Sequence, residues 1–201
     1  MKNKTTYDRI VEAADKLFYQ QGFEHTSFTD IADAVRISRG NFYHHFKSKD
    51  EILEAVIELR LANTRMMLEQ WEAQAQDPRE RIRSFINILI MNRAKIKLYG
   101  CPVGTLCTEL VKLEHPSRPE ANKLFTLFRT WLRRQFSLLG CDKDADELAL
   151  HLLARSQGVA TLASTFHDEK FIRQEVKVMG DWLESITNKT KTTTQKRRSA
   201  V

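Results

Sequence analysis

Side chains that can bind DNA bases occur together in one short stretch, residues 38–44. Arg39 and Asn41 are of the types that form paired hydrogen bonds with guanine and adenine in the major groove, and His44 lies in the same stretch. Gly40 lacks a side chain, so the backbone around it can approach a groove closely. This combination predicts contact with the bases of a double helix.

Two short helices separated by a turn would place these side chains on an exposed face. The first helix is indicated by apolar residues at spacings of three and four. They are Phe28, Ile31, Ala32 and Val35. Ser38 can cap the second helix, in which Phe42 and Phe46 lie four residues apart and face inward. The pattern predicts a helix-turn-helix, whose second helix lies in the major groove.

Residues 31–49, with the sequence IADAVRISRGNFYHHFKSK, resemble the DNA-binding signature of TetR-type repressors. The resemblance implies that Tyr43 and Lys49 contact phosphates. Thr26 and Ser27 stand at the start of a predicted helix, whose free N–H groups can bind a phosphate as well. The complete set of expected DNA-contacting residues is Thr26, Ser27, Arg36, Ser38, Arg39, Gly40, Asn41, Tyr43, His44 and Lys49.

Arg36 departs from the family pattern, which usually has glycine in this turn. Glycine adopts a positive φ freely, whereas arginine does not. Two consequences are open at this stage. Either the turn has a slightly different conformation, or Arg36 adds a phosphate contact.

The rest of the chain predicts helices and no strands. Glycine and proline are scarce, at seven and four of 201 residues, and apolar residues recur with helical spacing. We expect an all-α fold in which a three-helix head, residues 1–48, precedes a larger helical effector-binding and dimerisation domain, residues 49–187. Helices in that domain are predicted from 49 into the seventies and over 79–99, 103–113, 120–139, 143–165 and 168–187. Residues 188–201 form a basic tail.

Most of the net charge of +6 comes from this tail, which has five basic residues and no acidic one. The head has seven Lys and Arg against six Asp and Glu, so it would bind DNA poorly without specific contacts. The tail is expected to be a disordered, solvated end. Alternatively, it adds a salt-sensitive attraction to DNA.

The composition predicts a cytoplasmic protein without membrane contact. No run of about 18 uncharged apolar residues could span a bilayer, and residues 1–18 lack the apolar core of a signal peptide. The three cysteines have no paired spacing, which is typical of free thiols in a reducing compartment.

The last two predicted helices favour a homodimer. Small residues in the first would let two helices approach closely: Ser156, Gly158, Ala160, Ala163 and Ser164. The second has two apolar stripes, one of Ile172, Val176, Met179, Leu183 and Ile186 and one of Phe171, Val178 and Trp182. One stripe can face the chain's own core and the other a second subunit, although a wider core within one chain would give the same pattern. A symmetric dimer would place two recognition helices about 34–36 Å apart, one turn of DNA.

The resemblance also implies a small effector, bound among the middle helices, that releases the protein from its DNA operator. The candidate effector-binding residues are Phe85, Asn92, Arg93, Cys101, Cys107, Phe128 and Trp131. The polar candidates are otherwise surface or structural residues. The spacing of the aromatic ones alone predicts a simple core.

Cys101 suggests an alternative within the same family, a repressor that senses electrophiles or oxidants. A thiol at a helix start ionises more readily, whereas a free cysteine is ordinarily a small buried hydrophobe. A metal site of Cys101, Cys107 and His115 is rejected, because a fourth ligand and compact spacing are lacking. The sequence has no catalytic motif and implies no cofactor. An all-helical small-molecule or lipid carrier with a vestigial head is the alternative from another class.

Overall fold

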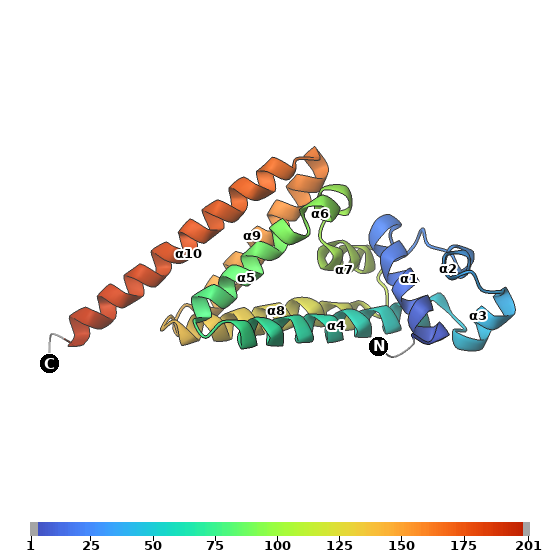
Figure 1. The fold of residues 1–201 in the computed structure, drawn as a ribbon, viewed down its shortest axis with the longest axis horizontal. Coiled ribbons are helices and arrows are strands. Elements are labelled where there is room, and N and C mark those ends of the chain that lie inside the picture. The colour runs from blue at the N-terminus through green and yellow to red at the C-terminus, as the bar shows by residue number, and fades with distance from the viewer. Residues whose placement is uncertain (1–3, 199–201) are drawn as a thin grey trace. The chain divides into compact units, whose positions relative to one another are not determined.

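The computed structural model describes residues 4–198, with side chains up to residue 187. Within that range the chain forms ten helices and no strand, which confirms the all-α prediction (Figure 1). They are α1 Thr6–Gln21, α2 Phe28–Val35, α3 Arg39–His45, α4 Lys49–Gln74, α5 Pro78–Met91, α6 Arg93–Tyr99, α7 Pro102–Lys112, α8 Arg118–Leu138, α9 Ala145–Phe166 and α10 Glu169–Arg198. None of these described helices is both long and apolar enough to cross a membrane.

Short-range capping contacts explain where several helices begin. Ser27 and Asp30 form a reciprocal capping box at the start of α2, and a second box caps α1. At the start of α5, Asp77 accepts a hydrogen bond from the N–H of Arg79, with Pro78 in the first helical position. Each cap satisfies N–H groups that have no partner within the helix.

The chain divides into two compact units. Unit 1 holds the residues through Arg65 together with Pro102–Phe125, so that α7 and the beginning of α8 pack with the first three helices. Unit 2 holds Met66–Cys101 and the residues from Thr126 onward. α4 and α8 each begin in unit 1 and end in unit 2. The functional boundary at residue 48 stays a prediction.

In unit 2, α10 packs against α5 and α9, and α6 packs against α9 (Figure 1). Ile172, Met179 and Leu183 of α10 are completely buried. The first apolar stripe of this helix therefore belongs to the core of its own chain. An ion pair between Arg93 Nε and Glu169 Oε1, at 2.6 Å, adds a polar contact between α6 and α10.

The helix predicted over 79–99 is interrupted, which corrects that prediction. α5 ends at Met91, and Asn92 has φ −104° and ψ 7° before α6 begins. The Asn92 side chain donates to the carbonyl oxygen of Ile88 at 3.0 Å, and Arg93 donates from Nη1 to that of Ile90 at 2.9 Å. The backbone N–H of Asn92 still donates to the carbonyl oxygen of Ile88 at 3.1 Å, whereas the Arg93 side chain occupies the carbonyl oxygen of Ile90, which a continuous helix would pair with the N–H of Ala94.

The end of the last helix also differs from the expected boundary. The sequence predicts that it stops at residue 187, whereas α10 continues to Arg198. Side chains from residue 188 on, and residues 199–201 entirely, lie outside the described part of the chain. The predicted disorder of the tail and its attraction to DNA therefore stay predictions.

Candidate nucleic-acid interface

The turn between α2 and α3 keeps the left-handed conformation that glycine would favour. Arg36 has φ 59° and ψ 50°. The N–H groups of Arg36 and Ile37 donate to the carbonyl oxygens of Asp33 and Ala32, at 3.1 and 3.2 Å, and close the end of α2. The left-handed turn is thus formed with arginine at the position where glycine is usual, and the phosphate contact of Arg36 stays a prediction. This conformation costs a non-glycine residue roughly 1–2 kcal/mol.

α3 begins at a side-chain cap. The hydroxyl of Ser38 accepts a hydrogen bond from the N–H of Asn41 at 3.3 Å. The helix has one buried side chain, Phe42, which is 1% exposed. The predicted base-contacting residues lie on its open surface, and Tyr43 is 47% exposed. Exposed together are Arg39, Gly40, Asn41, Tyr43 and His44.

Aromatic rings hold α3 in place from its inner side. Phe42 meets Phe28 of α2 edge to face, with ring centroids 5.3 Å apart. Phe46, which follows the helix and is 3% exposed, stacks on Tyr7 of α1 at 4.9 Å. Such buried aromatic contacts each contribute roughly 0.5–1.5 kcal/mol beyond their burial. The exposed face of α3 is therefore presented by a rigid support.

A contact that the sequence reasoning missed braces the turn itself. Arg9 of α1 donates from Nη2 to the carbonyl oxygen of Val35 at 2.6 Å. Val35 is the last residue of α2, where carbonyl oxygens lack partners within the helix. A guanidinium at this position also interacts favourably with the negative end of the helix dipole. The two partners are 26 positions apart in sequence, so no helical or strand spacing indicates the contact.

Three expected phosphate contacts have partners within the protein. Thr26 is 1% exposed, and its hydroxyl donates to the carbonyl oxygen of Gly22 at 2.6 Å. Ser27 is exposed, but its hydroxyl donates to Asp30 Oδ2 at 2.7 Å. Lys49 donates from Nζ to the carbonyl oxygens of Phe23 and Glu24. These residues shape the loop between α1 and α2, whereas the face of α3 is open to solvent.

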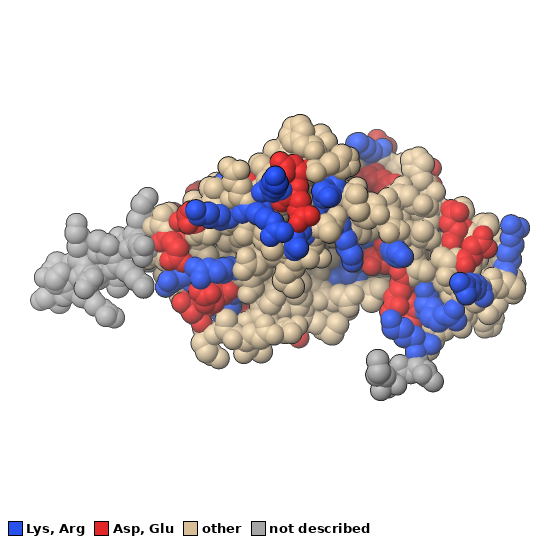
Figure 2. All heavy atoms as spheres, turned by 45° about the horizontal axis from the view of Figure 1, so that its top comes forward, with Lys and Arg blue, Asp and Glu red and all other residues tan. Residues whose placement is uncertain are grey.

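The charge around the head is mixed. Hydrogen bonds from the Ser27 backbone N–H and hydroxyl lower the pKa of Asp30 below its ordinary value, so this carboxylate is ionised at the start of α2. A negative charge there opposes phosphate binding at the same N–H groups. Figure 2 shows basic and acidic side chains interspersed over the visible face, without one large patch of a single sign. Affinity for DNA must then depend on the contacts of α3 more than on a general basic surface.

The candidate effector residues do not come together at one place. Phe85 and Phe128 are buried and touch edge to face at 5.5 Å within the core of unit 2. Cys107 belongs to unit 1, where it is 5% exposed and its Sγ lies 3.6 Å from the carbonyl oxygen of Ala121. Asn92 and Arg93 form the break between α5 and α6, and Cys101 is half-buried.

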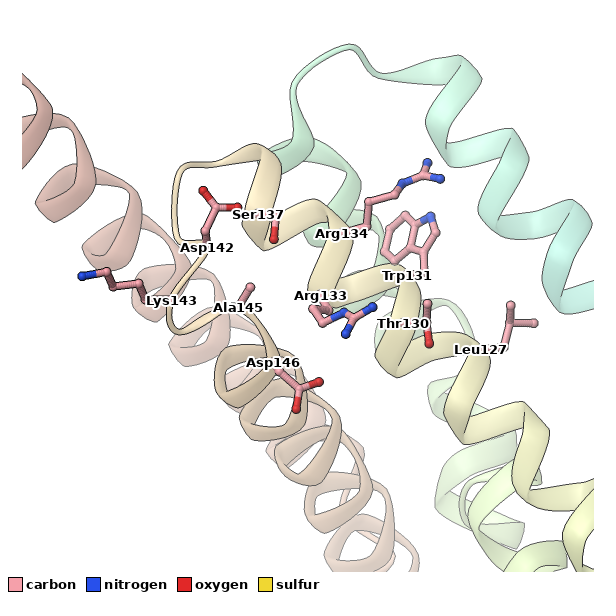
Figure 3. Close-up of a pocket in the computed structure, with 10 residues that line it drawn as sticks. All are labelled: Leu127, Thr130, Trp131, Arg133, Arg134, Ser137, Asp142, Lys143, Ala145 and Asp146. Atoms are coloured by element: carbon pink, nitrogen blue, oxygen red, sulfur yellow. The ribbon is translucent and has the colours of Figure 1, made fainter.

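Trp131 is the one candidate that lines a groove of about 680 Å³ beside the turn from α8 to α9 (Figure 3). Its indole Nε1 donates to Glu72 Oε1 at 2.6 Å, so its polar end already has a partner in α4. Residues of both charges surround the groove. Its lining comprises Leu127, Thr130, Trp131, Arg133, Arg134, Ser137, Asp142, Lys143, Ala145 and Asp146.

Comparisons with known proteins agree with this geometry. The family model described as bacterial regulatory proteins, tetR family, matches residues 10–56, from within α1 to within α4. An uncharacterized HTH-type transcriptional regulator in the lacX 3′ region of Lactococcus lactis subsp. lactis is 26% identical over 190 residues, which are 92% of this chain and 97% of the relative. Residues 10–56 of the chain thus match the tetR family, as the resemblance of residues 31–49 implies.

Other known transcriptional regulators are also similar to this chain. The HTH-type transcriptional regulator TtgR of Pseudomonas putida is 38% identical over 53 residues, 26% of this chain and 25% of its own. A TetR transcriptional regulator from Legionella pneumophila shares the fold with a TM-score of 0.80 at 23% identity, covering 92% of this chain and 99% of the other. The chain is a DNA-binding transcriptional regulator of the helix-turn-helix type.

Proposed function

We propose that the protein is a homodimeric repressor that binds a palindromic operator and leaves it when a small effector binds. The observation that carries this proposal is the face of α3, where Arg39, Asn41 and His44 are exposed while Phe42 is buried beneath them. Direct contact of Arg and Asn with base edges discriminates one base pair from another by roughly 1–3 kcal/mol. The same helix would contact the backbone of the duplex through Ser38, Gly40 and Tyr43.

The proposed dimer surface is a stripe along α9. Every fourth residue from Leu150 to Phe166 is exposed, and we name this set the α9 stripe. Its members are Leu150, Ala154, Gly158, Leu162 and Phe166. A Cβ added to Gly158 would meet no atom within 4 Å, so another helix could approach there. Phe166 is 68% exposed, and Leu162 one turn earlier is exposed as well. Exposed apolar side chains that lie together mark a surface for contact with another protein.

The second stripe predicted for α10 supports the same surface. Val178 is 39% exposed, whereas Ile172 and Met179 of the other stripe are buried. Three of the small residues predicted to face a partner, Ser156, Ala160 and Ala163, are buried instead. They allow close packing within the chain, and the α9 stripe replaces them in the proposed interface.

Release by an effector is proposed from the family alone. α4 and α8 each have residues in both compact units, so a ligand that displaces either helix can act on the head. We propose that the effector binds within the helical domain 49–187. We also propose that the regulator is cytoplasmic. The carrier with a vestigial head is not favoured, because the relatives are regulators and the head is complete. A thiol sensor using Cys101 would itself be a repressor of this kind, and the comparisons do not favour it.

Selection of duplexes from a random DNA pool by the purified protein tests the proposal. We expect a palindromic consensus whose two half-sites have centres about one turn apart, because a symmetric dimer presents two copies of α3. A consensus without symmetry would overturn the dimeric repressor. Absence of any enrichment would overturn sequence-specific binding itself.

A further inference from the structure

We propose that Glu109 of α7 is a positioning residue for DNA binding, which fixes the loop between α1 and α2 and thereby makes the head depend on the position of α7. This inference rests on the function proposed above. Residues 22–27 form the loop in question, and α7 packs against α1 within unit 1. The sequence places Glu109 in a mainly apolar segment, residues 103–113, far from any DNA-binding motif.

Both oxygens of the Glu109 carboxylate accept hydrogen bonds from the loop. Oε2 lies 3.0 Å from the backbone N of Phe23, and Oε1 lies 2.9 Å from that of Glu24. Two successive N–H groups thus converge on one carboxylate, and hydrogen bonds to an ionised acceptor are stronger than neutral ones. The partners are 86 and 85 residues apart in sequence.

Gly22 makes this approach possible. Its φ is +91°, in the region that favours glycine, and it ends α1. A Cβ at this position would lie 3.0 Å from Glu109 Oε1 and 3.3 Å from Oε2. A side chain here would therefore be strained and would also push the carboxylate away from the loop.

The opposite side of the same dipeptide is held by α4. Lys49 Nζ donates to the carbonyl oxygens of Phe23 and Glu24, at 3.1 and 3.2 Å. His115, in the turn after α7, packs edge to face on the Phe23 ring at 5.2 Å. The N–H groups of the dipeptide are thus bound by α7 and its carbonyl oxygens by α4.

The loop leads directly to the helix that supports α3. Thr26 is bound through its hydroxyl to Gly22, and Ser27 caps α2. A shift of α7 by about 1 Å would stretch both Glu109 contacts past the length of a hydrogen bond. Because α7 begins at Pro102, directly after the segment of unit 2 that ends at Cys101, a change in unit 2 can reach this contact along the chain.

The negative charge of Glu109 allows a positioning role to be distinguished from a purely electrostatic effect on DNA affinity. Removing a negative charge from a DNA-binding protein should strengthen its attraction to phosphates. Our proposal predicts the opposite sign for Glu109→Gln, because the amide keeps one acceptor oxygen and turns an NH₂ donor towards the loop. Glu54→Gln, at an exposed position of α4 in the same unit, removes the same charge without touching the loop.

The experiment compares full-length wild type, Glu109→Gln, Glu109→Ala and Glu54→Gln on the duplex selected by the wild type, well below their unfolding temperatures. We expect about tenfold weaker binding for Glu109→Ala, a smaller loss for Glu109→Gln, and unchanged or tighter binding for Glu54→Gln. Hydrogen exchange at the Phe23 and Glu24 amides should become about tenfold faster in both Glu109 variants.

Two results separate the possible failures. If the Glu109 variants melt at lower temperature but bind the duplex within twofold of wild type, Glu109 serves stability alone and the inference is overturned. If the wild type selects no duplex at all, the proposed function is overturned and this inference with it. Unchanged exchange at Phe23 and Glu24 would overturn the contact itself.

Discussion

The ammonium group of Lys49 lies 4.3 Å from the centre of the Phe23 ring and donates to the carbonyl oxygen of the same residue at 3.1 Å. A cation over an aromatic face and a charged donor on a carbonyl both favour this position. The family resemblance assigns Lys49 to a DNA phosphate. Within the protein its charge is directed at the loop between α1 and α2.

We therefore predict that Lys49→Met destabilises the protein as well as weakening DNA binding. Loss of a charged donor to two carbonyl oxygens should lower the free energy of unfolding by about 1–2 kcal/mol. Chemical denaturation measures this change. Lys16→Met, at an exposed position of α1, removes the same charge and should leave stability nearly unchanged. Equal stability of the two variants would show that the contact with Phe23 contributes nothing.

Arg36→Gly should make the protein more stable. The substitution relieves the left-handed strain at φ 59°, and the added freedom of glycine in the unfolded chain offsets part of the gain. The net increase should be at most about 1 kcal/mol. Thermal unfolding compares this variant with Arg36→Ala, which keeps the strain and is expected to be less stable than Arg36→Gly.

The same pair of variants tests the phosphate contact proposed for Arg36. Both remove the guanidinium, so both should reduce the slope of log affinity against log salt by about one unit. If the slope stays at the wild-type value in both variants, Arg36 makes no phosphate contact. A reduced slope in only one of the two variants would show that its substitution changes the turn between α2 and α3.

Local features of the fold are predictable because their causes are close in sequence. The capping box of Ser27 and Asp30 joins residues three apart, and the inward faces of Phe42 and Phe46 follow from helical spacing. The contact of Glu109 with Phe23 joins residues 86 apart, and no periodic pattern encodes it. No periodic pattern encodes the burial of Thr26 either, because tertiary packing determines the path of its loop.

The break at Asn92 is a different kind of failure. The apolar residues on both sides keep helical spacing, so the pattern predicts one helix. At the break, the Arg93 side chain donates to the carbonyl oxygen of Ile90, which a continuous helix would pair with the N–H of Ala94. The effector site is the part least predictable from sequence, because polar residues such as Arg93 form structural ion pairs that look like binding groups.

The acid sensitivity of the head should depend on Asp30. Hydrogen bonds from the Ser27 backbone N–H and hydroxyl lower the pKa of Asp30 in the folded state. Its contribution to stability is therefore fully present above the unfolded value of about 3.9 and is lost as pH falls through the lower, folded value. Asp30→Asn should be less stable than wild type at pH 7, and the difference should shrink below about pH 4.

Denaturant midpoints measured from pH 3 to pH 7 check this expectation. Asp33→Asn is the matched control, because Asp33 is an exposed acid in the same helix outside its first turn. It should change the midpoint little at any pH. A gap between wild type and Asp30→Asn that stays constant across the range would contradict the account of the cap.

Phe166→Glu should convert the proposed dimer into a monomer. A carboxylate placed in an apolar interface must lose its hydration without gaining a partner. Sedimentation at micromolar concentration measures the mass of wild type and variant. Met91→Glu is the control, because Met91 is 75% exposed and lies outside the α9 stripe. A variant that stays dimeric would place the interface elsewhere.

The central claim is that the exposed face of α3 recognises the base sequence of an operator. Its most direct test repeats the selection from random DNA with wild type and with Asn41→Ala in parallel. We predict the same palindrome for both, except at one symmetric pair of positions where the variant loses roughly 1–3 kcal/mol of discrimination. An unchanged consensus with Asn41→Ala, and likewise with Arg39→Ala, would contradict the assignment of α3 as the recognition helix.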